Sequence, residues 1–194
     1  HGLAIVADAT LRDLTGMSSM QSLDGGLVID RNDALTSLDG LEFITSLGKA
    51  LTLFGNNQLD DLQGLRNLTA LGGLLEIRRN ATLRSLDGLE GLDSIRTDLG
   101  ITSNPALVSL EAMRGLRTVG GAVEVRDNGA LVSLAGLESI RSAEHLTIIG
   151  HPRLTRLAQM DQLTQIRGSL TISLNAVLTS LAGLDQLATV QGFV

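Results

Sequence analysis

Apolar residues recur along the chain with a period of 24 residues. The consecutive units begin at Leu3, Leu27, Leu51, Leu75, Leu99, Val123, Leu146 and Leu170. Every unit that is followed by another has 24 residues, except the 23-residue unit from Val123 to His145. The clearest copy fills seven apolar slots with Leu27, Ile29, Leu35, Leu38, Leu41, Ile44 and Leu47. A unit this short cannot enclose its own leucines, so we expect equivalent units to stack and bury them between neighbours.

Each unit divides into two kinds of local structure. The opening Leu-x-Ile alternates with period two, which predicts a short strand that pairs in parallel with its neighbours. The later apolar residues are three apart, which favours a tight helical turn. A short polar residue stands before that turn and can accept its free N–H groups: Asp13, Ser37, Asp61, Ser85, Ser109, Ser133 and Ser180. The pattern predicts a leucine-rich-repeat-like, right-handed parallel β-solenoid of eight turns, with a strand and a short helical turn per unit.

Two further residue types recur at fixed positions. Asparagine occupies the sixth position of six units: Asn32, Asn56, Asn80, Asn104, Asn128 and Asn175. A buried amide there can satisfy backbone groups at the corner after the strand, so we interpret this file as structural, with Asp8 and His151 filling the remaining slots. Glycine recurs at Gly16, Gly40, Gly64, Gly88, Gly136 and Gly183, which indicates close backbone approach at a corner rather than a phosphate loop.

Composition narrows the class of protein. Hydrophobic residues make up 43% of the chain and aromatic residues 2%, so the core must be narrow and aliphatic. No linker divides residues 1–194, which predicts a single domain, and the start at His1 without Met indicates a fragment of a longer protein. A net charge of −6 without a basic cluster argues against nucleic acid as a partner. No apolar run is long enough to insert into a membrane.

The motif L-x-I-x-x-N-x-x-L-x-S-L-x-G-L-x-x-I, read over residues 27–44 and again, with a final leucine, over residues 170–187, resembles the receptor L-domain family. In this family variant a leucine follows the asparagine after three residues, as from Asn32 to Leu35. The resemblance implies a non-enzymatic module that binds proteins at a cell surface or outside the cell. The absence of cysteine removes the disulfides that staple the animal receptors, which argues against a hormone-receptor role. The regular units, rich in leucine, glycine, alanine, arginine and aspartate, look more like those of a bacterial surface protein.

Catalytic and metal-binding groups are scarce. Three histidines, with no cysteine and no tyrosine, provide no recognisable catalytic set, and we expect no enzyme activity, no cofactor and no metal. A zinc site of Glu144, His145 and His151 is the one metal alternative, although His151 fits the asparagine slot. Glu76 and Glu124 lie at the same outward strand position two turns apart, which leaves open a polysaccharide-active or polysaccharide-binding solenoid.

Binding is instead expected on the outward strand positions, which vary from turn to turn. The candidate residues are Phe54, Arg78, Arg79, Glu124 and Arg126, since an aromatic residue beside arginines is typical of interface hot spots. A protein ligand is favoured, and a cell-wall glycan remains an alternative. Thr52, Thr147 and Thr171 form only a broken threonine ladder, which leaves a purely structural or ice-binding solenoid as a further alternative. The apolar end turns predict cover by flanking sequence or self-association.

Overall fold

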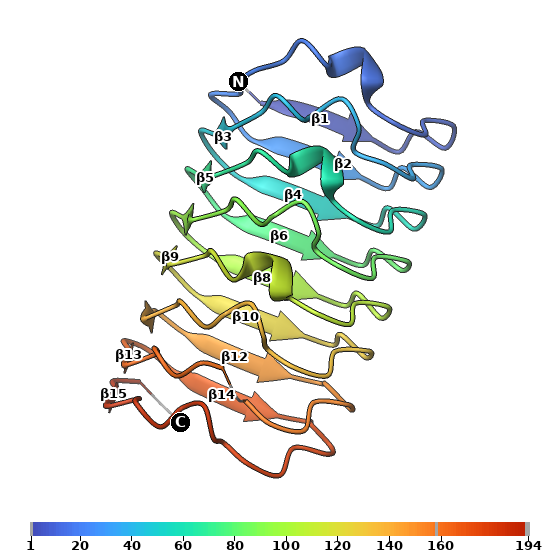
Figure 1. Ribbon diagram of the computed structural model, residues 1–194. Coiled ribbons are helices and arrows are strands. Elements are labelled where there is room, and N and C mark those ends of the chain that lie inside the picture. The colour runs from blue at the N-terminus through green and yellow to red at the C-terminus, as the bar shows by residue number, and fades with distance from the viewer. Residues whose placement is uncertain (1, 158, 193–194) are drawn as a thin grey trace.

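The computed structural model describes residues 2–157 and 159–192, which form a parallel β-solenoid of eight turns. One strand of each turn joins a single eight-stranded sheet, called the main sheet (Figure 1). Its strands, in spatial order, are β1 (Leu3–Val6), β2 (Leu27–Asp30), β4 (Leu51–Phe54), β6 (Leu75–Arg78), β8 (Leu99–Thr102), β10 (Val123–Arg126), β12 (Leu146–Ile149) and β14 (Leu170–Ser173). Equivalent positions lie opposite each other, as Leu27 does Leu51, so the 24-residue period sets the register.

Short strands on another side of turns two to eight form a second layer that is split in two. Four strands pair as β3 (Ser46–Leu47), β5 (Ala70–Leu71), β7 (Ser94–Ile95) and β9 (Thr118–Val119). Three more pair as β11 (Ser142–Ala143), β13 (Gln165–Ile166) and β15 (Thr189–Val190). The split between β9 and β11 adjoins the unit that is one residue short, whereas the main sheet runs past it unbroken.

The seven apolar slots point into the stack, as the sequence predicts. In the interior turns their side chains are almost completely buried; Leu51, Leu75 and Leu99, for example, are each 0% exposed. Packing between turns therefore supplies the core, because each leucine contacts the equivalent residues on both sides. In the first and last turns most of these slots are only partly buried; Leu14 is an exception at 4% exposed, whereas Leu181 is 55% exposed.

The segment that follows the asparagine corner takes two forms, which alternate over turns one to six. Turns one, three and five contain single 3-10 turns, η1 (Thr15–Met17), η2 (Gln63–Leu65) and η3 (Glu111–Met113). In turn seven, Ala158 of this segment lies outside the described residues. Turns two, four, six and eight have instead a glycine with φ of 105–112°. These glycines are Gly40, Gly88, Gly136 and Gly183. The expected short helical turn therefore forms in turns one, three and five, whereas in turn seven Gln159, at the glycine position, has a φ of 90°.

The polar residues before these segments accept backbone hydrogen bonds as the sequence predicts. Asp13 Oδ1 accepts the Thr15 N–H at 3.0 Å in an odd turn, and Ser133 Oγ accepts the Ala135 N–H at 2.9 Å in an even one. The same short side chain thus caps both forms, because each begins with a tight bend two residues later. Among the described residues, no helix is long and apolar enough to cross a membrane.

The fifth residue of every unit has a left-handed backbone. These residues are Ala7, Arg31, Gly55, Arg79, Ser103, Asp127, Gly150 and Leu174, with φ between 53 and 77°. A left-handed conformation costs about 1–2 kcal/mol at a residue other than glycine. Hydrogen bonds offset this cost, since the Arg31 N–H donates to the Phe54 carbonyl at 2.8 Å and the same bond repeats along the stack. The sharp bend ends each strand and turns the chain toward the asparagine slot.

Candidate functional site

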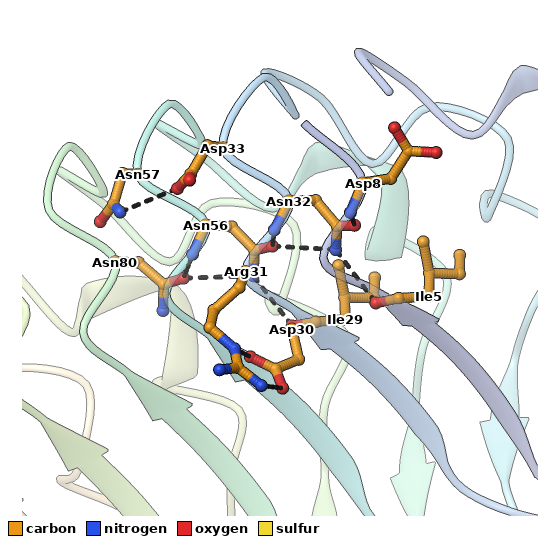
Figure 2. A network of polar contacts seen from close by, with 10 residues as sticks. All are labelled: Ile5, Asp8, Ile29, Asp30, Arg31, Asn32, Asp33, Asn56, Asn57 and Asn80. Atoms are coloured by element: carbon orange, nitrogen blue, oxygen red, sulfur yellow. Dashed lines mark hydrogen bonds and ion pairs between the residues drawn. The ribbon is translucent and has the colours of Figure 1, made fainter. Parts of the chain in front are cut away.

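A ladder of buried asparagines fixes the edge of the main sheet where the strands end (Figure 2). The Asn56 N–H donates to Asn80 Oδ1 at 2.9 Å, and Asn56 Nδ2 donates to the Ile29 carbonyl at 2.9 Å. Equivalent bonds join Asn32 to Asn56 and Asn80 to Asn104. Each side chain therefore satisfies backbone groups of the preceding turn at a corner that water does not reach. This arrangement holds the outward strand positions in fixed register.

His151 takes one step of this ladder without reproducing all of its bonds. The side chain is 0% exposed, with Nε2 3.1 Å from the Val125 carbonyl and Nδ1 3.2 Å from the Asn128 carbonyl. Its own N–H donates to Asn175 Oδ1 at 2.9 Å, so the ladder resumes in the next turn. An imidazole has no carbonyl oxygen, however, and offers the Asn128 N–H no counterpart of the amide oxygen found in the other steps. The Asn128 corner is therefore the weak step of the ladder.

Phe54, Arg78 and Arg79 come together on the main sheet as the sequence predicts. Phe54 lies opposite Arg78 on the neighbouring strand, and the guanidinium carbons of Arg78 and Arg79 both lie 5.8 Å from the centre of the phenyl ring. Arg79 reaches the ring because its left-handed backbone ends the strand. The ring is half-buried, and Arg79 is exposed. This trio, called the Phe54 cluster, holds two cations against one aromatic ring.

Glu124 and Arg126 lie apart from the Phe54 cluster. They form an ion pair along β10, two strands beyond Arg78, and Gly100 and Thr102 of β8 separate the two groups. The five candidate residues therefore make two patches on one face instead of a continuous site.

A shallow hollow of about 260 Å³ opens between these patches, over Gly100. Its polar lining consists of the carboxylates of Glu76, Asp98 and Glu124, and Asp98 Oδ1 also accepts the Ala122 N–H at 2.8 Å. Sequence reasoning placed Glu76 and Glu124 on one file but missed the hollow and Asp98. The available signal was Gly100, which interrupts the file of outward side chains between the two glutamates.

Two carboxylates outside the strands of the main sheet, those of Asp8 and Asp13, have lowered pKa values. Hydrogen bonds from the amide and hydroxyl of Thr10 lower the pKa of Asp8 below its ordinary value of 3.8. The hydroxyl and amide of Thr15 likewise lower the pKa of Asp13. Both carboxylates are exposed and close local turns in the first unit, which is ordinary structural chemistry.

The histidines of the proposed zinc site have other partners. His145 Nδ1 accepts the Ser169 N–H at 2.9 Å, whereas the ring of His151 faces the two carbonyls in the asparagine ladder. Within the described ranges, no three histidine or carboxylate side chains are placed to hold a metal ion.

Asn67 and Asn80, which both begin an Asn-x-Ser/Thr glycosylation motif, differ sharply in accessibility. Asn80 is 0% exposed in the ladder, whereas Asn67 is exposed and its Nδ2 donates to the Glu42 carbonyl at 2.6 Å.

Comparison with known proteins adds no relative: no family model, curated protein or solved structure matches the chain.

Proposed function

We propose that the chain is a non-enzymatic binding module that recognises a protein partner through the main sheet, with the Phe54 cluster as its anchor. The observation that carries this proposal is the packing of Arg78 and Arg79 on one phenyl ring, each at 5.8 Å from its centre. An aromatic ring and arginines held together on a rigid face have the composition of an interface hot spot.

The scaffold supports this role because it fixes the backbone beneath the anchor. The inward positions of the main-sheet strands hold leucine, isoleucine or valine in every turn. The outward position that Phe54 occupies holds instead Asp30 on one neighbouring strand and Arg78 on the other. A face ordered in advance by the core and the asparagine ladder binds without an added ordering cost at its backbone. Affinity then depends on the few outward side chains.

The chemistry of the face favours a protein over a glycan as partner. A sugar platform needs flat exposed rings, and Phe54 is half-buried beneath two guanidinium groups. The neighbouring rows carry opposite charges, with Glu76 and Glu124 on one row and Arg78 and Arg126 on the next. A partner with paired acidic and basic side chains matches this pattern. By its resemblance to the receptor L-domain family, we place the module at a cell surface.

The proposal is tested by screening the purified chain against arrays of cell-surface proteins and of cell-wall glycans. Each hit is then measured with the Phe54→Ala/Arg78→Glu double variant. Removal of an anchor that contributes about 2 kcal/mol or more weakens binding by about 30-fold or more. Circular dichroism and the unfolding midpoint establish that the variant is folded.

Arg84→Glu is the matched control, since Arg84 is exposed and lies outside the main sheet. It makes the same charge reversal as Arg78→Glu and should leave the affinity unchanged. A folded double variant that binds the partner as tightly as the unaltered chain would show that the Phe54 cluster is not the contact surface. A glycan hit with no protein hit would overturn the assigned partner class.

A further inference from the structure

The second layer of strands is interrupted between β9 and β11, and one hydrogen bond between backbones of consecutive turns is missing there. On one side the Arg117 N–H donates to the Asp93 carbonyl at 2.9 Å, and on the other the Thr164 N–H donates to the Arg141 carbonyl at 2.9 Å. Between them, among the described residues, the Arg141 N–H makes no such bond to Arg117. The unit is one residue short between β11 and β12, and β9 and β11 stay close together without pairing as strands.

A hollow of about 530 Å³ lies at the interruption, lined by Arg117, Thr118, Ser139, Arg141 and Gln162. Arg117 and Arg141 occupy equivalent positions of consecutive turns, about 4.8 Å apart along the stack at the usual strand spacing. Among the described residues, no acidic side chain lines the hollow, although Asp93 pairs with Arg117. Arg141 therefore gives the hollow a positive charge, whereas the whole chain carries −6.

The lining side chains retain several free hydrogen-bond donors. Arg117 uses one nitrogen on Asp93, with Nη1 2.7 Å from Oδ1, and keeps the rest of its five N–H groups. Arg141 is exposed and forms no ion pair within the described part of the chain. The Ser139 hydroxyl donates to the Arg114 carbonyl at 3.1 Å and is thereby committed.

We propose that this hollow, called the Arg117–Arg141 hollow, binds a tetrahedral oxyanion, a sulfate or phosphate group. Arg117 and Arg141 supply guanidinium groups from adjacent turns, and the Thr118 hydroxyl, the Gln162 amide and the Arg141 N–H are further donors. A planar carboxylate presents only two oxygens, whereas a tetrahedral oxyanion presents three or four and satisfies more of these donors. The site lies outside the main sheet and is independent of the proposed protein contact.

The test titrates the ¹⁵N-labelled chain separately with inorganic sulfate and inorganic phosphate, at ionic strength held constant with chloride. We expect saturable shifts of the amide signals of Arg141 and its neighbours. The anion that binds more tightly identifies whether sulfate or phosphate is the preferred group. Arg117→Gln and Arg141→Gln should each weaken binding by about tenfold, the effect of losing one charge-assisted contact.

Two further variants separate the site from general charge attraction. Arg84→Gln removes an exposed arginine elsewhere and should leave the affinity unchanged. Insertion of one glycine between Ala143 and Glu144 restores the 24-residue unit, so binding should be lost while both arginines remain. The proposal is overturned by shifts that do not saturate, by equal losses in Arg84→Gln and Arg141→Gln, or by undiminished binding in the folded insertion variant. Acetate binding as tight as sulfate overturns the tetrahedral assignment.

Discussion

Replacement of Asn80 by leucine, which has nearly the same shape, tests how much the asparagine ladder stabilises the fold. Asn80 Oδ1 accepts the Asn56 N–H at 2.9 Å, and Asn80 Nδ2 donates to the Leu53 carbonyl at 3.1 Å. Both backbone groups belong to residues that are 0% exposed, so no water can replace the lost partner. An unsatisfied buried polar group costs about 1–3 kcal/mol, so two of them lower the free energy of unfolding by about 2–6 kcal/mol.

This loss is large compared with the roughly 5–15 kcal/mol that separates folded from unfolded states of ordinary domains. It is measured by urea denaturation followed by circular dichroism, with the slope of the transition compared between variants. Asn57→Leu is the matched control: Asn57 is the next residue, is exposed, and its Nδ2 donates to Asp33 Oδ1 at 3.1 Å. We expect less than about 1 kcal/mol from that change. The reasoning is that the cost comes from leaving buried backbone groups without a partner, and not from replacing an asparagine as such. Equal losses of unfolding free energy in Asn80→Leu and Asn57→Leu would refute it.

Three other changes test separate features of the stack. Gly88→Ala should destabilise the chain by at least about 2 kcal/mol, since φ is +111° and a Cβ would lie 1.9 Å from a carbonyl oxygen of the preceding turn. Gly16→Ala, at the equivalent position with no atom within 4 Å, should be nearly neutral in the same denaturation assay. His151→Asn should provide an amide oxygen for the Asn128 N–H and stabilise the fold by about 1 kcal/mol. A lower unfolding midpoint would contradict the conclusion that the Asn128 corner is the weak step of the ladder. Thr15→Ala should raise the pKa of Asp13 toward 3.8 in an NMR titration, because the hydroxyl stabilises the carboxylate. Because the pKa of Asp13 is lowered in the folded state, its contribution to stability is present above pH 3.8 and is lost as the pH falls through the folded pKa. An unchanged pKa in Thr15→Ala would exclude the hydroxyl as the cause of the lowering.

The sequence was sufficient to predict the main sheet because its period sets which residues meet. Leu27 lies opposite Leu51, and Phe54 opposite Arg78, as a constant 24-residue unit requires. The same arithmetic placed Glu76 and Glu124 two strands apart. Residue spacing alone therefore located the members of the candidate site.

The bends and openings of the chain could not be predicted in this way. Arg31 and Arg79 have left-handed backbones that their residue type disfavours, and the repeated hydrogen bonds of the stack offset the cost. Some corners also depend on the turn before them: a Cβ at Gly88 would meet the Leu62 carbonyl oxygen. The Arg117–Arg141 hollow arises where one residue is missing in a neighbouring segment, so its arginines carry no local signal.

Over turns one to six, the alternation of 3-10 and glycine corners gives this solenoid a rule of parity. The Leu14 N–H of turn one donates to the Asp39 carbonyl of turn two, and the Leu62 N–H of turn three donates to the Asp87 carbonyl of turn four. Each such bond joins an odd turn to the even turn that follows. Removal of one of turns two to five would place two corners of the same form in contact, whereas removal of two consecutive turns there would preserve the alternation. This part of the molecule can therefore be lengthened or shortened with least disturbance in steps of two turns.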